Sequence, residues 1–237
     1  MALFGFGSRK SRAPAAPPAP DPRLVNVIYE RACAYVMGPD KRIHVEDLLS
    51  ALAAVTGEAC LRAVGEVPIE SHAFTPGSMV FSEAVNRVLC DDARSWPEAP
   101  ADSVFGVLYR EAVAASYDPA AFPPLPEVFA LLAKGVGATE WGWVPLSTKD
   151  GRPFVMPIRA AFELRAKVTE ALNVFAIPPG DQARVCAYAL AKALAAVREA
   201  IDHEVALSIS VETVNGMAKT APMTAAHFAE MQKGAAS

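Results

Sequence analysis

Residues 44–64 read HVEDLLSALAAVTGEACLRAV, and this stretch carries the strongest structural signal of the chain. Its apolar side chains, from Val45 to Ala59, recur at intervals of three and four residues, which places them on one face of an α-helix. Gly57 lies inside the pattern and costs about 1 kcal/mol relative to alanine, so it either lies within one long helix or divides two helices. We expect this segment to belong to a helical core.

Apolar residues recur at the same helical spacing in other segments on both sides of this one. Proline or glycine separates most of these segments. Further helices are expected to begin near residues 22, 79, 102, 127, 158, 181 and 224. Residues 204–214 are ambiguous, because Val205, Leu207, Ile209 and Val211 alternate with small residues as they would in a strand. No glycine or proline separates them from the preceding helix, which favours helix. The sequence therefore predicts a mainly α, multi-helix globular domain over residues 22–237.

Residues 140–157 differ from the rest, because they are rich in aromatic residues and centre on Asp150-Gly151. Gly151 takes a positive φ without a Cβ penalty, as a tight hairpin turn requires. Pro145 and Pro153 each remove a backbone donor, so the strands would be short or at an edge. We expect one β-hairpin here. Its aromatic and sulfur side chains are candidates for binding a partner: Trp141, Trp143, Phe154 and Met156.

Composition excludes several classes of protein. The chain has 237 residues, of which 52% are apolar, enough for a sizeable core, and its net charge of −4 with dispersed lysines and arginines argues against nucleic acid as a partner. No apolar run approaches the roughly 20 residues that span a bilayer. Cys33, Cys60, Cys90 and Cys186 lie far apart in apolar surroundings, so we expect buried, reduced thiols. A cytoplasmic protein is the resulting expectation.

Residues 1–21 are expected to form a disordered tail rich in proline and alanine, because proline fixes φ and donates no backbone hydrogen bond. Asp21-Pro22 reads as an N-cap followed by proline at the first helical position. Phe4 and Phe6 precede a short basic cluster, so weak contact of the tail with an anionic membrane surface is an alternative role.

Four polar residues are candidates for a pocket between helices: His44, Glu46, His203 and Glu204. His44 and Glu46 stand at a helix start, where acidic side chains also favour the helix dipole. Glu199 and His203 share the spacing of two metal ligands, but no second such pair exists, so we expect no metal and no cofactor. On a continuous helix Glu204 would be partly buried beside Val197, unless the helix bends near His203.

The sequence contains none of the short motifs of phosphate loops, dinucleotide-binding folds or nucleophile elbows. Our leading hypothesis is therefore a non-catalytic interaction or structural protein, which contacts a protein partner or a second copy of itself through the hairpin. The competing hypothesis is a small enzyme or ligand-binding protein that uses the four polar residues in an inter-helix pocket.

Overall fold

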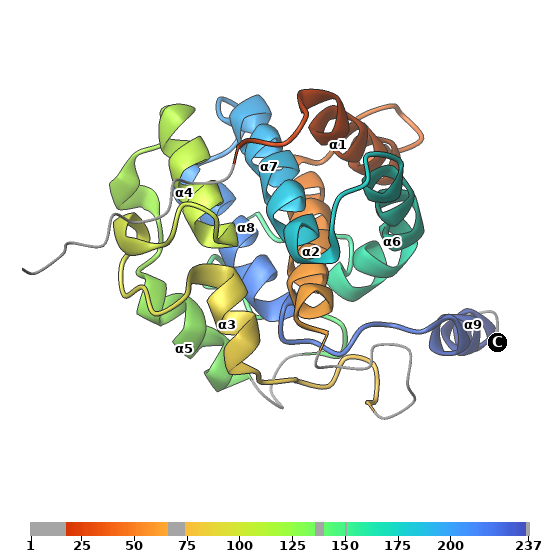
Figure 1. Cartoon of the computed structure of the whole chain (residues 1–237). Helices are drawn as coiled ribbons and strands as arrows, with labels where there is room; N and C mark the ends of the chain where they lie inside the picture. Colours follow the sequence, from red (N-terminus) through yellow and green to blue (C-terminus); the bar gives the residue numbers. More distant parts are fainter. Residues whose placement is uncertain (1–17, 66–73, 136–139, 150, 236–237) are drawn as a thin grey trace, which may run out of the picture.

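The computed structural model describes residues 18–65, 74–135, 140–149 and 151–235 (Figure 1), and within these ranges it contains nine α-helices. They are α1 (Pro22–Val36), α2 (Val45–Val64), α3 (Glu83–Cys90), α4 (Val104–Ala114), α5 (Leu125–Gly135), α6 (Pro157–Val174), α7 (Pro179–Val197), α8 (His203–Met217) and α9 (Ala225–Ala235). Two 3-10 turns, η1 (Trp96–Glu98) and η2 (Pro119–Ala121), flank α4. The predicted mainly α fold is confirmed.

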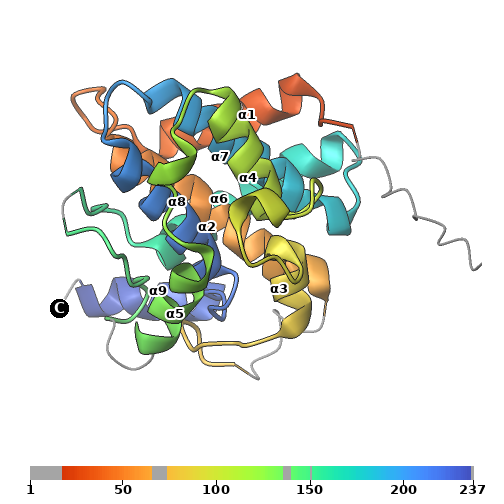
Figure 2. The same cartoon turned by 90° about the vertical axis from the view of Figure 1, so that its left-hand side faces the viewer.

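Helix α2 lies at the centre of the molecule. Every residue from Asp47 to Leu61 is buried, and α2 contacts α1, α3, α6, α7 and α8 (Figures 1 and 2). A helix covered on all sides needs small residues where its neighbours come closest, which explains the high alanine content of this segment. Buried residues from Leu24 to Ala221 form one large apolar cluster around it.

Helices α2 and α8 run parallel, with their backbones close together. A Cβ atom on Gly57 would lie 2.5 Å from the Val214 carbonyl oxygen and 2.8 Å from the Ala218 nitrogen, so this position leaves no room for a side chain. At the other end Gly151 lies against Val205 of α8 and Glu46 of α2. Gly57 thus lies within one helix, where it allows close contact with α8.

Residues 204–214 are helical, and the strand alternative is wrong. They do not continue the preceding helix, however, because α7 ends at Val197 and a new helix begins at His203. The Asp202 carboxylate accepts hydrogen bonds from the backbone N–H groups of Glu204 and Val205, which caps the start of α8. This break leaves Glu204 exposed, instead of partly buried as a continuous helix would require.

The predicted β-hairpin near 140–157 is wrong. The described residues contain no strand, only two isolated bridges, Met37–Ile43 and Met79–Thr220. Trp143 N donates to the Glu140 carbonyl in a tight turn in which Gly142 has φ +81°, and Gly151 has the positive φ that its position in the sequence predicted. The backbone donors after the turn bind carboxylate side chains instead of a second strand.

The structure near the two ends of the described chain can be compared with the predictions from the sequence. Residues 1–17 of the predicted tail lie outside the described residues, whereas Asp21 caps α1 by accepting a hydrogen bond from Arg23 N, as expected. Helix α9 contacts α6 through Phe228, whose ring centre lies 4.7 Å from that of Phe162. No helix in the described part of the chain is long and apolar enough to cross a membrane.

Three of the four thiols lie in the core. Cys60, Cys90 and Cys186 are buried and Cys33 is half-buried, and none forms a disulfide. Burial raises the pKa of Cys90 to about 11 and that of Cys186 to about 12. These two thiols are therefore protonated at neutral pH in the folded state. Burial was expected at all four positions and is found at three of them.

Candidate functional site

Residues 140–149 and 151–156, which we call the strap, lie lengthwise along α8 and are held by two buried carboxylates. Ser147 donates from its backbone N–H (2.8 Å) and its hydroxyl (2.5 Å) to the carboxylate of Glu212. Phe154 N (2.6 Å) and Val155 N (2.9 Å) donate to Oδ1 of Asp47 in the first turn of α2. An irregular segment is thereby fixed at its middle and near its C-terminal end against the two central helices.

Glu212 holds the strap at an electrostatic cost. Its side chain is buried in α8, and burial raises the pKa of its carboxyl, while the two hydrogen bonds from Ser147 act in the opposite direction. No cation within the described residues forms an ion pair with it. Burying a carboxylate without a cation costs free energy, and the two hydrogen bonds from Ser147 offset part of that cost.

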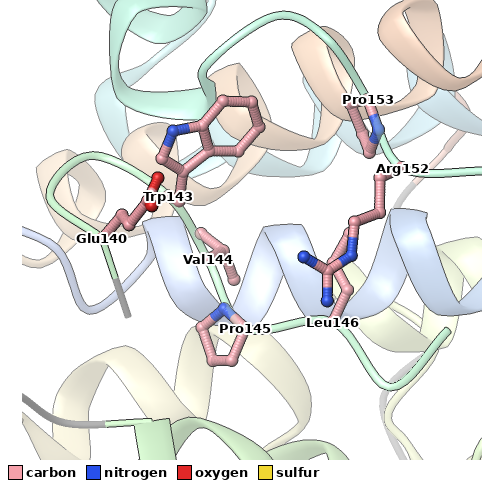
Figure 3. Close-up of a pocket in the computed structure, with 7 residues that line it drawn as sticks. All are labelled: Glu140, Trp143, Val144, Pro145, Leu146, Arg152 and Pro153. Atoms are coloured by element: carbon pink, nitrogen blue, oxygen red, sulfur yellow. The ribbon is translucent and has the colours of Figure 1, made fainter. Parts of the chain in front are cut away.

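The strap encloses a hollow of about 460 Å³, which we call the Trp143 pocket (Figure 3). Five apolar and two charged residues line it: Glu140, Trp143, Val144, Pro145, Leu146, Arg152 and Pro153. The half-buried Trp143 indole forms one wall, with Glu140 on its side of the hollow and the exposed Arg152 guanidinium across from it (Figure 3). Such a hollow is suited to an apolar group flanked by polar groups of opposite charge.

The other three hairpin candidates lie around this pocket in different environments. Trp141 is 42% exposed and donates from Nε1 to the Pro76 carbonyl (2.8 Å) while its ring covers Gly77. Phe154 is 77% exposed, and its ring meets that of His44 edge-on at 5.4 Å. Met156 is partly buried beneath Gly142 and packs on the small apolar cluster around Ile158. Trp141 and Trp143 therefore do not share a strand face.

The four polar candidates lie at the starts of α2 and α8, and none of them lines the Trp143 pocket. His44 is the N-cap residue of α2, and Glu46 lies beside Gly151 of the strap. The His203 ring stacks on Tyr117 at 4.5 Å, and Glu204 is exposed. Within the described residues no group of three or more His, Cys, Asp or Glu side chains could hold a metal ion.

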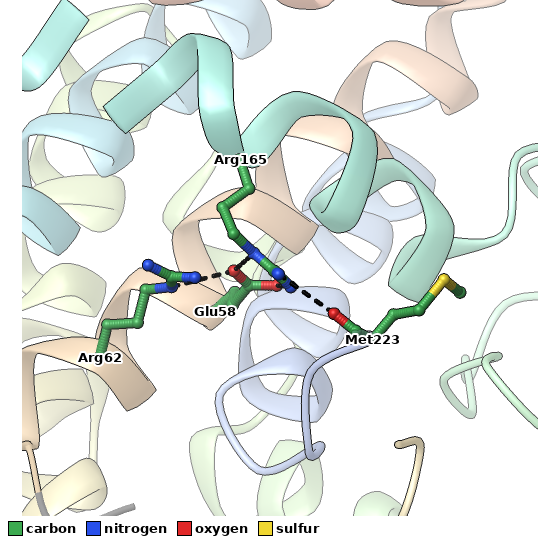
Figure 4. Close-up of polar contacts among 4 residues, drawn as sticks. All are labelled: Glu58, Arg62, Arg165 and Met223. Carbon is green, nitrogen blue, oxygen red and sulfur yellow. Dashed lines mark hydrogen bonds and ion pairs between the residues drawn. The ribbon is translucent and has the colours of Figure 1, made fainter. Parts of the chain in front are cut away.

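A second hollow, the α6 groove of about 1090 Å³, runs between α6 and residues 223–226. Its two arginines are already engaged by the buried Glu58 (Figure 4). Arg165 makes two hydrogen bonds to the Glu58 carboxylate (2.5 and 2.7 Å), and Arg62 makes one (3.1 Å). Arg165 also donates to the Met223 carbonyl (3.1 Å), which fixes the chain that leads into α9. The two arginines of this groove therefore serve the fold.

A lysine is buried just beyond α8. Lys219 is 4% exposed, donates to Asn215 Oδ1 (2.7 Å) and lies 4.1 Å from the centre of the Phe129 ring. Asn215 in turn donates to the Val128 carbonyl (3.0 Å), so both the nitrogen and the oxygen of its side-chain amide are hydrogen-bonded. Burial lowers the pKa of Lys219 from 10.5 to about 8. Its side chain contacts neither hollow, which argues for a role within the core.

The hold of Asp47 on the strap can be tested by Asp47→Ala. The change leaves the N–H groups of Phe154 and Val155 without their acceptor, which should lower the free energy of unfolding by about 1–3 kcal/mol. Hydrogen exchange of these two amides should accelerate more than that of Ser147, which Glu212 still holds. Glu46→Ala, one residue away, is the control, and equal protection in both variants would disprove this role of Asp47.

Sequence reasoning missed the residues that organise the site. Asp47, Glu212 and Arg152 are absent from the candidate residues predicted from the sequence. One signal was present, since Glu212, Asn215 and Lys219 are polar residues spaced along one face of an otherwise apolar helical segment.

Comparison with known proteins adds no independent assignment to these residues. No protein-family model matches this chain, and no curated protein or solved structure is detectably similar to it.

Proposed function

We propose that this chain is a non-catalytic interaction protein that binds a partner polypeptide on the strap. The observation that carries the proposal is the presence of three accessible aromatic side chains on this segment: Trp143 forms a wall of the pocket, and Trp141 and Phe154 are exposed. Aromatic side chains in partly desolvated hollows dominate the binding energy of protein interfaces, and charged groups at the rim add specificity.

The way in which the strap is held supports this proposal. An irregular segment would lose conformational freedom on binding, and that loss weakens affinity. Glu212 and Asp47 fix the strap beforehand from two helices, so its aromatic side chains are presented with little further ordering. Because Glu140 and Arg152 are both exposed at the rim, the pocket suits a polypeptide on the surface better than an enclosed small molecule.

Photo-crosslinking in the native cell tests the proposal. Leu146, which lines the pocket, is replaced by p-benzoylphenylalanine, and the same amino acid at the exposed Phe81 serves as the control. We expect a crosslinked polypeptide from position 146 that is absent from position 81. A crosslink to a second copy of this chain would identify self-association, and equal products at both positions would refute binding at the strap.

Trp143→Ala should weaken that crosslink at least tenfold while it leaves the helical circular-dichroism signal and most of the stability unchanged. The indole is half-buried at the rim of a hollow, so its removal costs few core contacts. Trp96→Ala is the contrasting variant, because Trp96 is buried and donates to the Pro123 carbonyl, and it should lose about 3–5 kcal/mol. A loss of that size in Trp143→Ala would place Trp143 in the core instead.

A further inference from the structure

The charges of the two large hollows differ in one respect that bears on the ligand. In the α6 groove both arginines bind Glu58, whereas the Arg152 side chain makes no ion pair or hydrogen bond with any residue that the structure describes. Its guanidinium therefore keeps its full set of donors for an outside group. A planar guanidinium at a pocket rim is well matched to a carboxylate, which it binds through two parallel hydrogen bonds.

The site has room for more than one side chain of a ligand. A side hollow of about 70 Å³ adjoins the Trp143 pocket, and the two share the lining residues Glu140, Trp143, Val144 and Pro145. Trp141, and Met79 on the neighbouring segment, also line the side hollow. Two adjoining hollows, one large and one small, suit an extended chain that places alternate side chains into them.

We propose that the strap recognises an extended peptide of a partner protein that carries an acidic residue next to apolar ones. The acidic side chain pairs with Arg152, a larger apolar side chain lies against Trp143, and a small apolar one enters the side hollow. Glu140 lies on the opposite side of the pocket from Arg152 and disfavours a second acidic residue there (Figure 3). This assignment of the ligand rests on the function proposed above.

Selection from a random decapeptide display library on the purified full-length protein tests the assignment. Wild-type protein should enrich peptides with Asp or Glu near apolar residues, and Trp143→Ala should enrich none. Arg152→Glu should reverse the preference to Lys or Arg, and it should weaken the selected acidic peptides about tenfold or more. Arg94→Glu makes the same charge change at another exposed arginine and should behave as wild type.

Unchanged circular dichroism of Arg152→Glu establishes that the variant is folded. Absence of any enrichment on the wild-type protein, or enrichment without acidic residues, overturns the assignment. Failure of the acidic-peptide assignment can be distinguished from failure of the proposed interaction function. A crosslinked partner whose contact segment lacks acidic residues would leave the interaction role standing and remove the acidic peptide, whereas absence of any crosslink at position 146 removes both.

Discussion

Glu58→Ala should lower the free energy of unfolding by about 3–5 kcal/mol, the largest loss that we expect from a single change of charge in this protein. The Glu58 carboxylate is buried and holds Arg165, whose side chain is 19% exposed, as well as Arg62 (Figure 4). Its removal leaves the Arg165 guanidinium in the interior with the Met223 carbonyl as its one remaining hydrogen-bond acceptor among the described residues. Urea unfolding followed by circular dichroism measures the change.

The control for this prediction is Glu83→Ala. Glu83 also pairs with an arginine one helical turn away, Arg87, but both side chains are exposed, so its loss should change stability by less than about 1 kcal/mol. Replacing Glu58 and Arg165 together by leucine and methionine should recover much of the loss, because the unpaired charge is then gone. Equal unfolding midpoints for Glu58→Ala and Glu83→Ala would contradict the importance of the buried pair.

Lys219→Met should alter the pH dependence of stability. The pKa of Lys219 is lowered to about 8 in the folded protein, whereas in the unfolded chain it has its ordinary value of 10.5. Between these values the unfolded chain binds more protons than the folded one, so this lysine makes stability rise with pH. Relative to Lys219→Met, the wild-type protein should therefore gain about 3 kcal/mol between pH 8 and pH 10.5.

Unfolding in urea at several pH values compares the two proteins, and the difference removes most of the contribution of the buried thiols that both share. Lys192→Met is a matched control, because Lys192 also bonds an asparagine side chain, Asn26, and lies over an aromatic ring, that of Tyr29, but at the surface. That variant should follow the wild-type pH profile. Parallel profiles for Lys219→Met and wild type would show that the ammonium is hydrated in the folded state.

Helices with one exposed face could be predicted from the sequence, because the alternation of solvent and core imposes the helical period. Helix α8 was ambiguous for the opposite reason. Its residues from Ala206 to Met217 are buried on every side, so small residues such as Ser208 and Ser210 no longer mark a solvent face. The alternation that they produce resembles a strand, and only the Asp202 cap distinguishes the helix start.

The conformation of the strap could not be predicted from the sequence. Its aromatic residues, its two prolines and its Asp-Gly pair indicate an unusual segment, and these local features are visible in the sequence. Its conformation depends on Glu212 and Asp47, which lie 65 and 107 residues from the donors that they bind. No local pattern marks a carboxylate as the acceptor for a distant backbone, so a strand partner was inferred where side chains serve instead.

The parallel contact between α2 and α8 has a consequence for the synthesis of this protein. About 140 residues separate the two helices, and at about 5–20 residues per second the ribosome needs roughly 10–30 s to supply α8 after α2 has been made. During that interval the apolar surface around Gly57 lacks the helix that covers it. A nascent chain that has not reached residue 217 is therefore the form most exposed to aggregation, and the form on which chaperones should act.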